Sequence, residues 1–146
     1  MAEIQRTAEA VWRGDSRSGS GTFSTGSGVI REQNYTWRMR FENEPGTNPE
    51  EMVAAAHASC FNMALAGDLG RAGIPPESLH TKAVLTMEKE EVGWTVKRIR
   101  LEVEAVVPNA DEATFRQHVE KAKNNCPISR LLAPGLQTLE VTAKLK

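Results

Sequence analysis

Apolar and polar residues alternate over residues 35–41, which is the pattern of a strand whose two faces meet different surroundings. One side carries only aromatic and apolar side chains: Tyr35, Trp37, Met39 and Phe41. Residues 4–12 alternate towards their end and predict a second strand. Residues 14–28 are dense in Gly and Ser around Phe23, which favours a short strand at 22–24 between tight turns of one sheet rather than a linker between domains.

The pattern changes to that of a helix after residue 47. Asn48 is a good N-cap, Pro49 suits the first helical position, and two glutamates follow in the first turn, near the positive end of the helix dipole. The segment is then rich in Ala and free of charge as far as Asp68. A helix that is apolar almost all round is expected to be buried on most of its sides. Gly70 or Gly73, with two prolines just beyond, is expected to end it.

The rest of the chain returns to strands and then mixes both types. Residues 79–90 and 93–107 predict a hairpin with its turn at 91–93. Asp111 is the expected cap of a helix that ends near residue 125, Pro127 opens a shorter helical turn, and residues 136–145 predict a last strand. Strands cluster rather than alternating with helices, so we expect an α+β fold with a mainly antiparallel sheet.

Length and composition narrow the class of protein. The chain has 146 residues, so we expect a single domain over residues 1–146. Its 40% hydrophobic and 25% charged residues are ordinary for a soluble globular protein. Eighteen Lys and Arg face nineteen Asp and Glu, for a net charge of −1. Binding to nucleic acid or to an anionic membrane surface is not expected, because both need a surplus of positive charge.

Targeting features are not expected either. The first residues lack the charged and then apolar order of a signal peptide, and the longest apolar stretch, 52–66, is shorter than the roughly 20 residues of a membrane span. We therefore expect a cytoplasmic protein that does not enter membranes. In that reducing compartment, two cysteines are either inert core residues or groups with redox or catalytic chemistry.

The two cysteines, Cys60 and Cys126, differ in their local surroundings. Cys60 lies deep inside the apolar helix, where it is either a small core residue or a reactive group. Cys126 precedes Pro127 at a predicted N-cap, where backbone N–H groups lower a thiol pKa, unless the segment is simply a corner between helices. On local electrostatics alone Cys126 is the better nucleophile. If folding brings the two thiols together, they form a nucleophile and a resolving partner.

A buried thiol becomes a thiolate only beside a cation or a hydrogen-bond donor. Arg38 and Arg40 are the candidates, the alternative being an exposed face of an edge strand. Glu50 is able to orient an arginine by a bidentate pair, although the helix dipole already explains an acid at this position. Glu50 and Cys60 are ten residues apart on the predicted helix, about 15 Å at about 1.5 Å per residue. A site that contains both would therefore need a second copy of the helix, and so a dimer.

Other chemistries find little support. His57 lies three residues before Cys60 and is a candidate base or ligand, but no paired spacing of Cys and His predicts a metal site. Residues 19–21 lack the Lys-Ser/Thr of a phosphate-binding loop, and no G-x-S-x-G motif is present. We expect neither a metal nor a cofactor.

Three segments together resemble the OsmC/Ohr family, a group of bacterial thiol peroxidases, and its OsmC branch more than its Ohr branch. They read YTWRMRFE at 35–42, GTNPEEMVAAAHASCFNMAL at 46–65 and NCPIS at 125–129. The resemblance implies an OsmC/Ohr-like fold, with antiparallel sheets around a long central helix, in an intertwined homodimer with its sites at the subunit interface. The resemblance covers essentially the whole chain.

The resemblance also implies the chemistry and the residues that perform it. Cys60 would reduce an organic hydroperoxide to an alcohol, and Cys126 would resolve the resulting sulfenic acid into a disulfide. Arg40 would hold the thiolate and Glu50 would hold the arginine, which reverses the assignment made on local electrostatics. An external dithiol, for which the family suggests a lipoylated protein, would recycle the disulfide.

Two other interpretations of the same residues remain. The first is a homodimer of this fold that senses oxidation, or binds an apolar ligand, without turnover. The second is a structural homodimer with two buried thiols. Whether Arg38 shares the role of Arg40, and what His57 does, is open at the level of the sequence.

Overall fold

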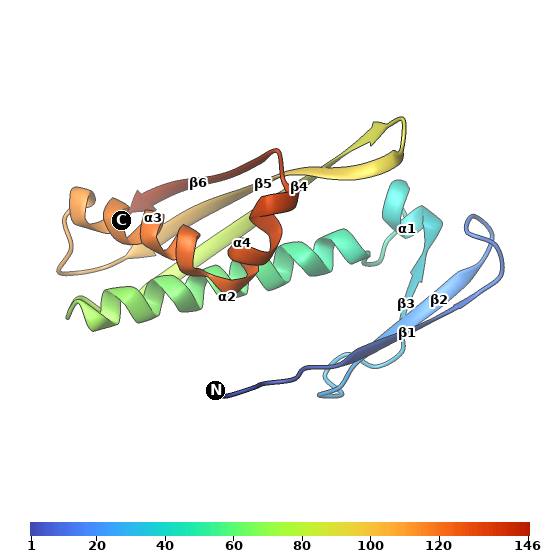
Figure 1. Cartoon of the computed structure of the whole chain (residues 1–146), viewed down its shortest axis with the longest axis horizontal. Helices are drawn as coiled ribbons and strands as arrows, with labels where there is room; N and C mark the ends of the chain where they lie inside the picture. Colours follow the sequence, from blue (N-terminus) through green and yellow to red (C-terminus); the bar gives the residue numbers. More distant parts are fainter. The chain divides into compact units, whose positions relative to one another are not determined.

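The computed structural model describes all 146 residues, which form two compact units, Met1–Met52 and Val53–Lys146. Their elements are α+β in composition, as predicted, and are labelled in Figure 1. The first unit contains β1 (Ala8–Arg13), β2 (Ser20–Thr25), β3 (Gln33–Thr36), α1 (Trp37–Phe41) and the start of α2 (Pro49–Arg71). The second contains the rest of α2, then β4 (Ser78–Glu90), β5 (Gly93–Val106), α3 (Glu112–Asn125), α4 (Pro127–Leu132), a short 3-10 turn (Ala133–Gly135) and β6 (Thr138–Leu145).

The first unit is built on a three-stranded antiparallel sheet in the order β1-β2-β3. Gly21 in β2 pairs with Trp12 on one side and with Tyr35 on the other. The two rings close over it, with centroids 5.3 Å apart. A Cβ at position 21 would lie 2.7 Å from the Trp12 ring and 2.8 Å from the Tyr35 ring, so the glycine is what allows this close approach.

The strand predicted over residues 35–41 is correct only for Tyr35 and Thr36, because the chain becomes the short helix α1 from Trp37 onwards. The Thr36 hydroxyl caps this helix by accepting a hydrogen bond from the backbone N–H of Met39 at 3.2 Å. The reason for the error is the spacing of Trp37 and Phe41. Residues four apart share one face of a strand and also one face of a helix, and here their rings pack at 5.4 Å on the helix.

The long helix α2 begins and ends with the predicted signals. The side-chain oxygen of Asn48 accepts the N–H of Glu51 at 2.8 Å. At the other end the N–H groups of Gly73 and Ile74 bond back into the last turn, each at 3.0 Å, and Gly73 has a φ of 76°. This is a Schellman ending, so Gly73 rather than Gly70 stops the helix.

Burial of α2 is more one-sided than the sequence predicts. Its buried residues are His57, Phe61, Leu65, Asp68 and Leu69. Side chains on another side of the helix are exposed in the single chain: Ala55, Ala56, Ser59 and Met63. No helix of the structure has both the length and the apolar character that crossing a membrane requires.

The second unit carries a sheet in the order β4-β5-β6. The hairpin of β4 and β5 is antiparallel, as predicted, and so are the pairs β1–β2 and β2–β3. Only β6 departs from this arrangement, because it lies parallel to β5. Alternate residues of β5, from Ile99 to Ala105, are buried. The helices α2, α3 and α4 lie along one side of this sheet (Figure 1). The core that they enclose includes Phe61 and Leu65 of α2 and Phe115 of α3.

Candidate functional site

The two cysteines meet in the second unit. Cys60 lies in the middle of α2, and Cys126 lies between α3 and α4, 66 positions away. The Cys126 thiol donates a hydrogen bond to Cys60 Sγ at a sulfur–sulfur distance of 2.9 Å, and both cysteines are free. Cys126 is fully buried, while Cys60 is half-buried. Of the two cysteines, Cys60 is therefore the one with exposed surface.

Cys126 occupies the N-cap of α4, with Pro127 next to it in the position expected of a first helical residue. Two backbone N–H groups of the following turn point at sulfur. That of Ser129 donates to Cys126 Sγ at 3.5 Å, and that of Ile128 bonds to Cys60. Removal from water raises the pKa of the Cys60 thiol, and the adjacent Cys126 thiol raises it further, against the opposing effect of the Ile128 N–H. In this environment Cys60 is a neutral thiol.

The predicted pair of Arg40 and Glu50 forms in the first unit. Arg40 extends from α1, and Glu50 lies in the first turn of α2. Arg40 Nε donates to both carboxylate oxygens, at 3.1 and 3.0 Å, and its Nη2 donates to Oε1 at 2.5 Å. The Glu50 side chain is only 13% exposed. This multidentate pairing fixes the plane of the guanidinium and leaves Nη1 without a hydrogen bond.

Arg38 does not take part in this pair. It lies on the same short helix but binds Glu42, four residues away, and the two side chains are 65% and 46% exposed. Such surface pairs contribute little to stability.

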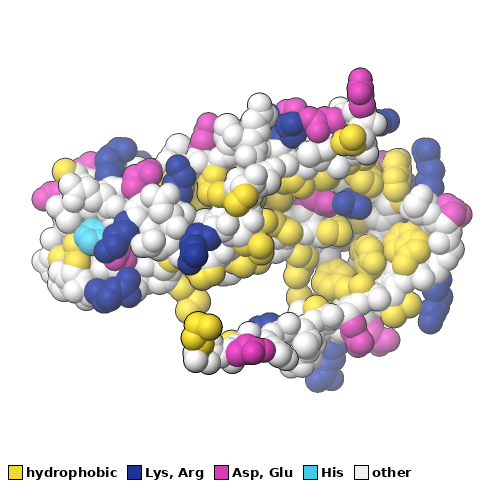
Figure 2. All heavy atoms as spheres, in the orientation of Figure 1, with side chains coloured by type: hydrophobic (Ala, Val, Ile, Leu, Met, Phe, Trp, Pro, Cys, Tyr) yellow, Lys and Arg dark blue, Asp and Glu magenta, His cyan; other side chains and the backbone are white.

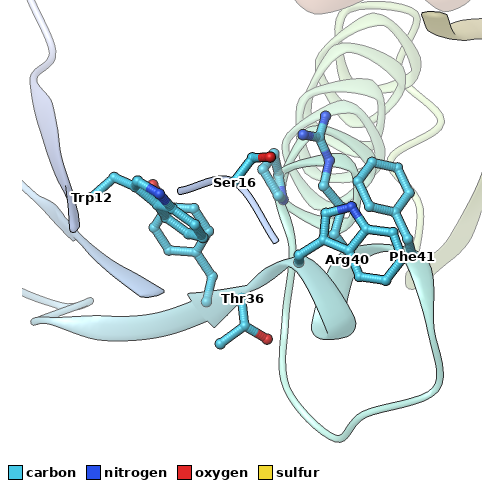
Figure 3. A pocket seen from close by; sticks show the side chains of 8 residues that line it. Trp12, Ser16, Thr36, Arg40 and Phe41 are labelled. Carbon is cyan, nitrogen blue, oxygen red and sulfur yellow. The ribbon is translucent and has the colours of Figure 1, made fainter. Parts of the chain in front are cut away.

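Arg40 also lines a hollow of about 430 Å³ in the first unit (Figure 3). Trp12 lies on one side of the hollow, and Arg40 and Phe41 lie on the other (Figure 3). Its further walls are Ser16, Tyr35, Thr36, Trp37 and Pro49. The Arg40 guanidinium lies 5.0 Å from the centre of the Phe41 ring. The result is an aromatic hollow with one cation in its wall.

Of the four predicted site residues, the structure brings together Cys60 with Cys126 and Arg40 with Glu50. Sequence reasoning did not identify the aromatic hollow as a feature. A signal was present, since Trp12, Tyr35, Trp37 and Phe41 hold four of the chain's eight aromatic residues within thirty positions. Sequence reasoning also did not predict which residue His57 contacts. His57 is buried in α2, and its Nε2 lies 2.7 Å from the hydroxyl of Ser129.

No group of three or more His, Cys, Asp or Glu side chains in the chain is arranged to hold a metal ion. The largest ionic cluster surrounds Asp68 of α2, which is buried. Its carboxylate accepts from His118 at 2.5 Å and from Lys121 at 2.7 Å, both on α3. The hydrogen bonds from Lys121 and His118 lower the pKa of Asp68 from 3.8 to about 2. This cluster joins α2 to α3.

Comparison with known proteins places this arrangement in a family. The model of the OsmC-like protein family matches residues 41–140. Peroxiredoxin OsmC of Escherichia coli is 46% identical over 129 residues, which cover 88% of this chain and 90% of the relative. The crystal structure of the organic hydroperoxide resistance protein OhrB of Bacillus subtilis matches with a TM-score of 0.70 at 24% identity, over 96% of this chain and 98% of that one. An OsmC-like protein from Mycoplasma pneumoniae matches with a TM-score of 0.77 at 17% identity, over 99% of each chain. The two structures confirm the expected OsmC/Ohr-like fold, and the sequence matches establish that the chain belongs to the OsmC-like protein family.

Proposed function

We propose that this protein is a thiol-dependent peroxidase that reduces organic hydroperoxides to alcohols. The observation that carries the proposal is the contact between the free thiols of Cys60 and Cys126 at 2.9 Å. A half-buried cysteine next to a fully buried one fits a pair in which the first is oxidised and the second resolves it. The 46% identity to a protein named peroxiredoxin OsmC supports the same function.

The proposed reaction has three steps: oxidation of Cys60, formation of the disulfide, and reduction of the disulfide. The Cys60 thiolate attacks the terminal oxygen of the hydroperoxide, so that an S–O bond forms, the O–O bond breaks, and the alkoxide takes a proton to leave as an alcohol. The Cys126 sulfur then attacks the Cys60 sulfenic acid. The S–S bond forms, the S–O bond breaks, and the hydroxyl leaves as water with the Cys126 proton. An external dithiol reduces the disulfide by exchange; the resemblance to the family favours a lipoylated protein in that role.

Activation of Cys60 needs a cation, because burial raises its pKa. Arg40 is the proposed source. Glu50 occupies Nε and Nη2 of its guanidinium, which leaves Nη1 for a thiolate or for the oxygens of a peroxide. Glu50 is thus a positioning residue, and Arg40 is a catalytic residue that stabilises negative charge.

A second copy of the chain is part of the proposal. Glu50 and Cys60 are ten residues apart on α2, about 15 Å along the helix, so the Arg40–Glu50 pair of one chain is proposed to serve Cys60 of its partner. The face of α2 that bears Ala55, Ala56 and Met63 is small, apolar and exposed, and Met63 is 78% exposed. Hydrophobic side chains are visible along α2 in the space-filling view (Figure 2). Such a face fits the interface of a homodimer.

The substrate class follows from the hollow beside Arg40. Four aromatic rings favour an organic residue over a hydrogen atom on the peroxide, because a bulky apolar group buries more surface there. The same hollow also favours a second candidate, a protein of this fold that binds an apolar ligand or reports oxidation without turnover.

Turnover separates the two candidates. The reduced protein is mixed with cumene hydroperoxide and excess dihydrolipoamide or dithiothreitol, and peroxide consumption is followed. A peroxidase consumes many equivalents of peroxide per chain. A sensor consumes one equivalent and stops, which would refute the proposal. Reaction of Cys60 no faster than that of an ordinary buried thiol would instead favour a structural role for both cysteines.

A further inference from the structure

His57 is a buried polar residue for which the proposed reaction has no use. It is 0% exposed, and burial lowers its pKa, so the imidazole is neutral. Nε2 lies 2.7 Å from the Ser129 hydroxyl, and Nδ1 has no hydrogen-bond partner. Burying an unpaired polar atom costs free energy, so such atoms are rare in folded proteins and call for an explanation.

The partner of His57 belongs to the turn that holds the resolving cysteine. Ser129 is 1% exposed, and its backbone N–H donates to Cys126 Sγ. His57 precedes Cys60 by three positions on α2, and Ser129 follows Cys126 by three positions at the start of α4. Residues three apart are neighbours on a helix. Two neighbouring contacts therefore join α2 to the start of α4. One is between His57 and Ser129, and the other is between Cys60 and Cys126.

We propose that His57 and Ser129 are a positioning pair that holds the first turn of α4 against α2, and thereby keeps Cys126 within reach of the Cys60 sulfenic acid. Beside the thiol–thiol contact and the bond of the Ile128 N–H to Cys60, theirs is the hydrogen bond between two side chains that joins α4 to α2. The inference rests on the proposed function and adds the residues that control its second step. That step is the one in which the Cys60–Cys126 bond forms and water leaves.

The rate of that step matters because the sulfenic acid has a competing fate. A second peroxide converts it into a sulfinic acid, which ordinary dithiols do not reduce. Loosening α4 lowers the fraction of time that Cys126 spends in contact with Cys60. It should slow disulfide formation and increase sulfinic acid, without slowing the first oxidation, because Cys60 itself stays in the middle of α2.

The test compares His57→Gln, His57→Ala, Ser129→Ala and the double variant His57→Ala/Ser129→Ala. Reduced protein reacts with one equivalent of cumene hydroperoxide, is quenched with an alkylating reagent at successive times, and is analysed by mass spectrometry. We expect the alanine variants to form the disulfide about three- to tenfold more slowly, with the loss of Cys60 thiol unchanged, and to accumulate more sulfinic acid in excess peroxide. The double variant should be no slower than the slower single variant, because the two residues act through one contact.

His57→Gln separates positioning from acid–base catalysis. The glutamine amide can replace Nε2 as a partner of the Ser129 hydroxyl, but it carries no titratable group. A positioning role predicts near wild-type disulfide formation with an unchanged pH profile. Disulfide formation as slow as in His57→Ala, or a profile that loses its pH dependence, would overturn it.

Thr81→Val is the matched control for general loosening of α2. The Thr81 hydroxyl donates to Asn62 Oδ1 at 2.6 Å and ties α2 to β4 rather than to α4. The inference predicts no increase in sulfinic acid for this variant, and an increase equal to that of Ser129→Ala would overturn it. Thermal unfolding of each variant shows that the proteins compared are folded.

A parallel experiment with diamide, which oxidises dithiols without peroxide, keeps the two proposals distinguishable. If the wild-type protein does not react with hydroperoxide, the proposed function fails. The positioning pair is then still tested, because Ser129→Ala should slow diamide-driven formation of the Cys60–Cys126 disulfide. An equal rate in wild-type and variant would overturn the inference on its own.

Discussion

Cys60 and Cys126 place their sulfur atoms 2.9 Å apart while both remain free thiols. A disulfide bond is about 2 Å long, so the oxidised form needs only a small approach of α4 towards α2. The fully buried Cys126 is shielded from solutes, whereas Cys60 is half-buried. In the proposed reaction, this contact would let resolution follow oxidation without unfolding of either helix.

Replacing Arg40 by Lys or Glu50 by Gln should slow the oxidation of Cys60 by about tenfold or more. Lysine cannot reproduce the multidentate pairing with Glu50, and glutamine no longer fixes the guanidinium. Because burial raises the pKa of Cys60, a cation that is no longer held in place should also move the pH profile of this oxidation to higher pH. Stopped-flow measurement of peroxide consumption across a pH series gives both quantities.

The matched control for these variants is Arg38→Lys, which alters the exposed pair with Glu42 on the same short helix. Its rate and pH profile should equal those of the wild-type protein. If Arg38→Lys and Arg40→Lys lowered the rate of Cys60 oxidation equally, the pairing of Arg40 with Glu50 would not be what controls that rate.

Changing Trp37 to Leu should weaken the preference for bulky substrates. The ring forms part of the wall of the hollow beside Arg40, and removing aromatic surface reduces the apolar contact with the organic group. We expect KM for cumene hydroperoxide to rise about tenfold, while kcat/KM for hydrogen peroxide stays within about twofold. Trp94→Leu, on β5 and outside this hollow, is the control. A similar change for both peroxides would argue against an aromatic substrate pocket.

Placing a charge on the exposed side of α2 should dissociate the proposed homodimer. Met63 is 78% exposed in the single chain, and Met63→Glu would bury a carboxylate in an apolar interface. Sedimentation velocity should then report a monomer with little peroxidase activity. Val92→Glu, in the hairpin turn and 91% exposed, should remain dimeric. A wild-type protein that sediments as an active monomer would contradict the dimer.

Acid stability should depend on Asp68. The pKa of this carboxyl is lowered from 3.8 to about 2 by hydrogen bonds from Lys121 and His118. A lowered pKa in the folded state adds stability above the unfolded-state value, and this stability is lost as the pH falls from about 4 towards 2. At pH 7, Asp68→Asn should lower the free energy of unfolding by about 1–3 kcal/mol.

Urea unfolding at several pH values measures this difference. The difference in the free energy of unfolding between wild-type and Asp68→Asn should disappear as the pH falls from about 4 towards 2. Glu112→Gln, which alters an exposed pair with Arg116, should cost little at any pH. If this difference in the free energy of unfolding stays constant down to pH 2, Asp68 acts through packing rather than through its charge.

Features set by neighbours in the sequence could be predicted well. Asn48 and Asp111 cap their helices as expected, and Cys126 with Pro127 opens α4. Each of these depends on one turn of backbone and the side chain beside it. The helix at Trp37 was missed because residues four apart fit both a strand and a helix, so only the Thr36 cap decides between them.

Features set by distant parts of the chain could not be predicted from the residues alone. The parallel pairing of β6 with β5 and the contact of His57 with Ser129, 72 positions apart, depend on how the helices pack on the sheet. The residues made Cys60 and Cys126 a candidate pair, but only the family resemblance led us to expect that they meet. The one-sided burial of α2 has a related cause: the sequence reports an apolar surface, but not whether the same chain or a second copy covers it.

The most direct test of the proposed peroxidase is the mass of the protein after one equivalent of organic hydroperoxide. The account predicts that the wild-type chain loses two hydrogen atoms, with Cys60 and Cys126 linked in one peptide. It predicts that Cys126→Ser gains one oxygen atom on Cys60, in a form that reacts with a sulfenic-acid reagent, and that Cys60→Ser does not react. Oxidation of Cys126 in the Cys60→Ser variant at the wild-type rate would contradict the account.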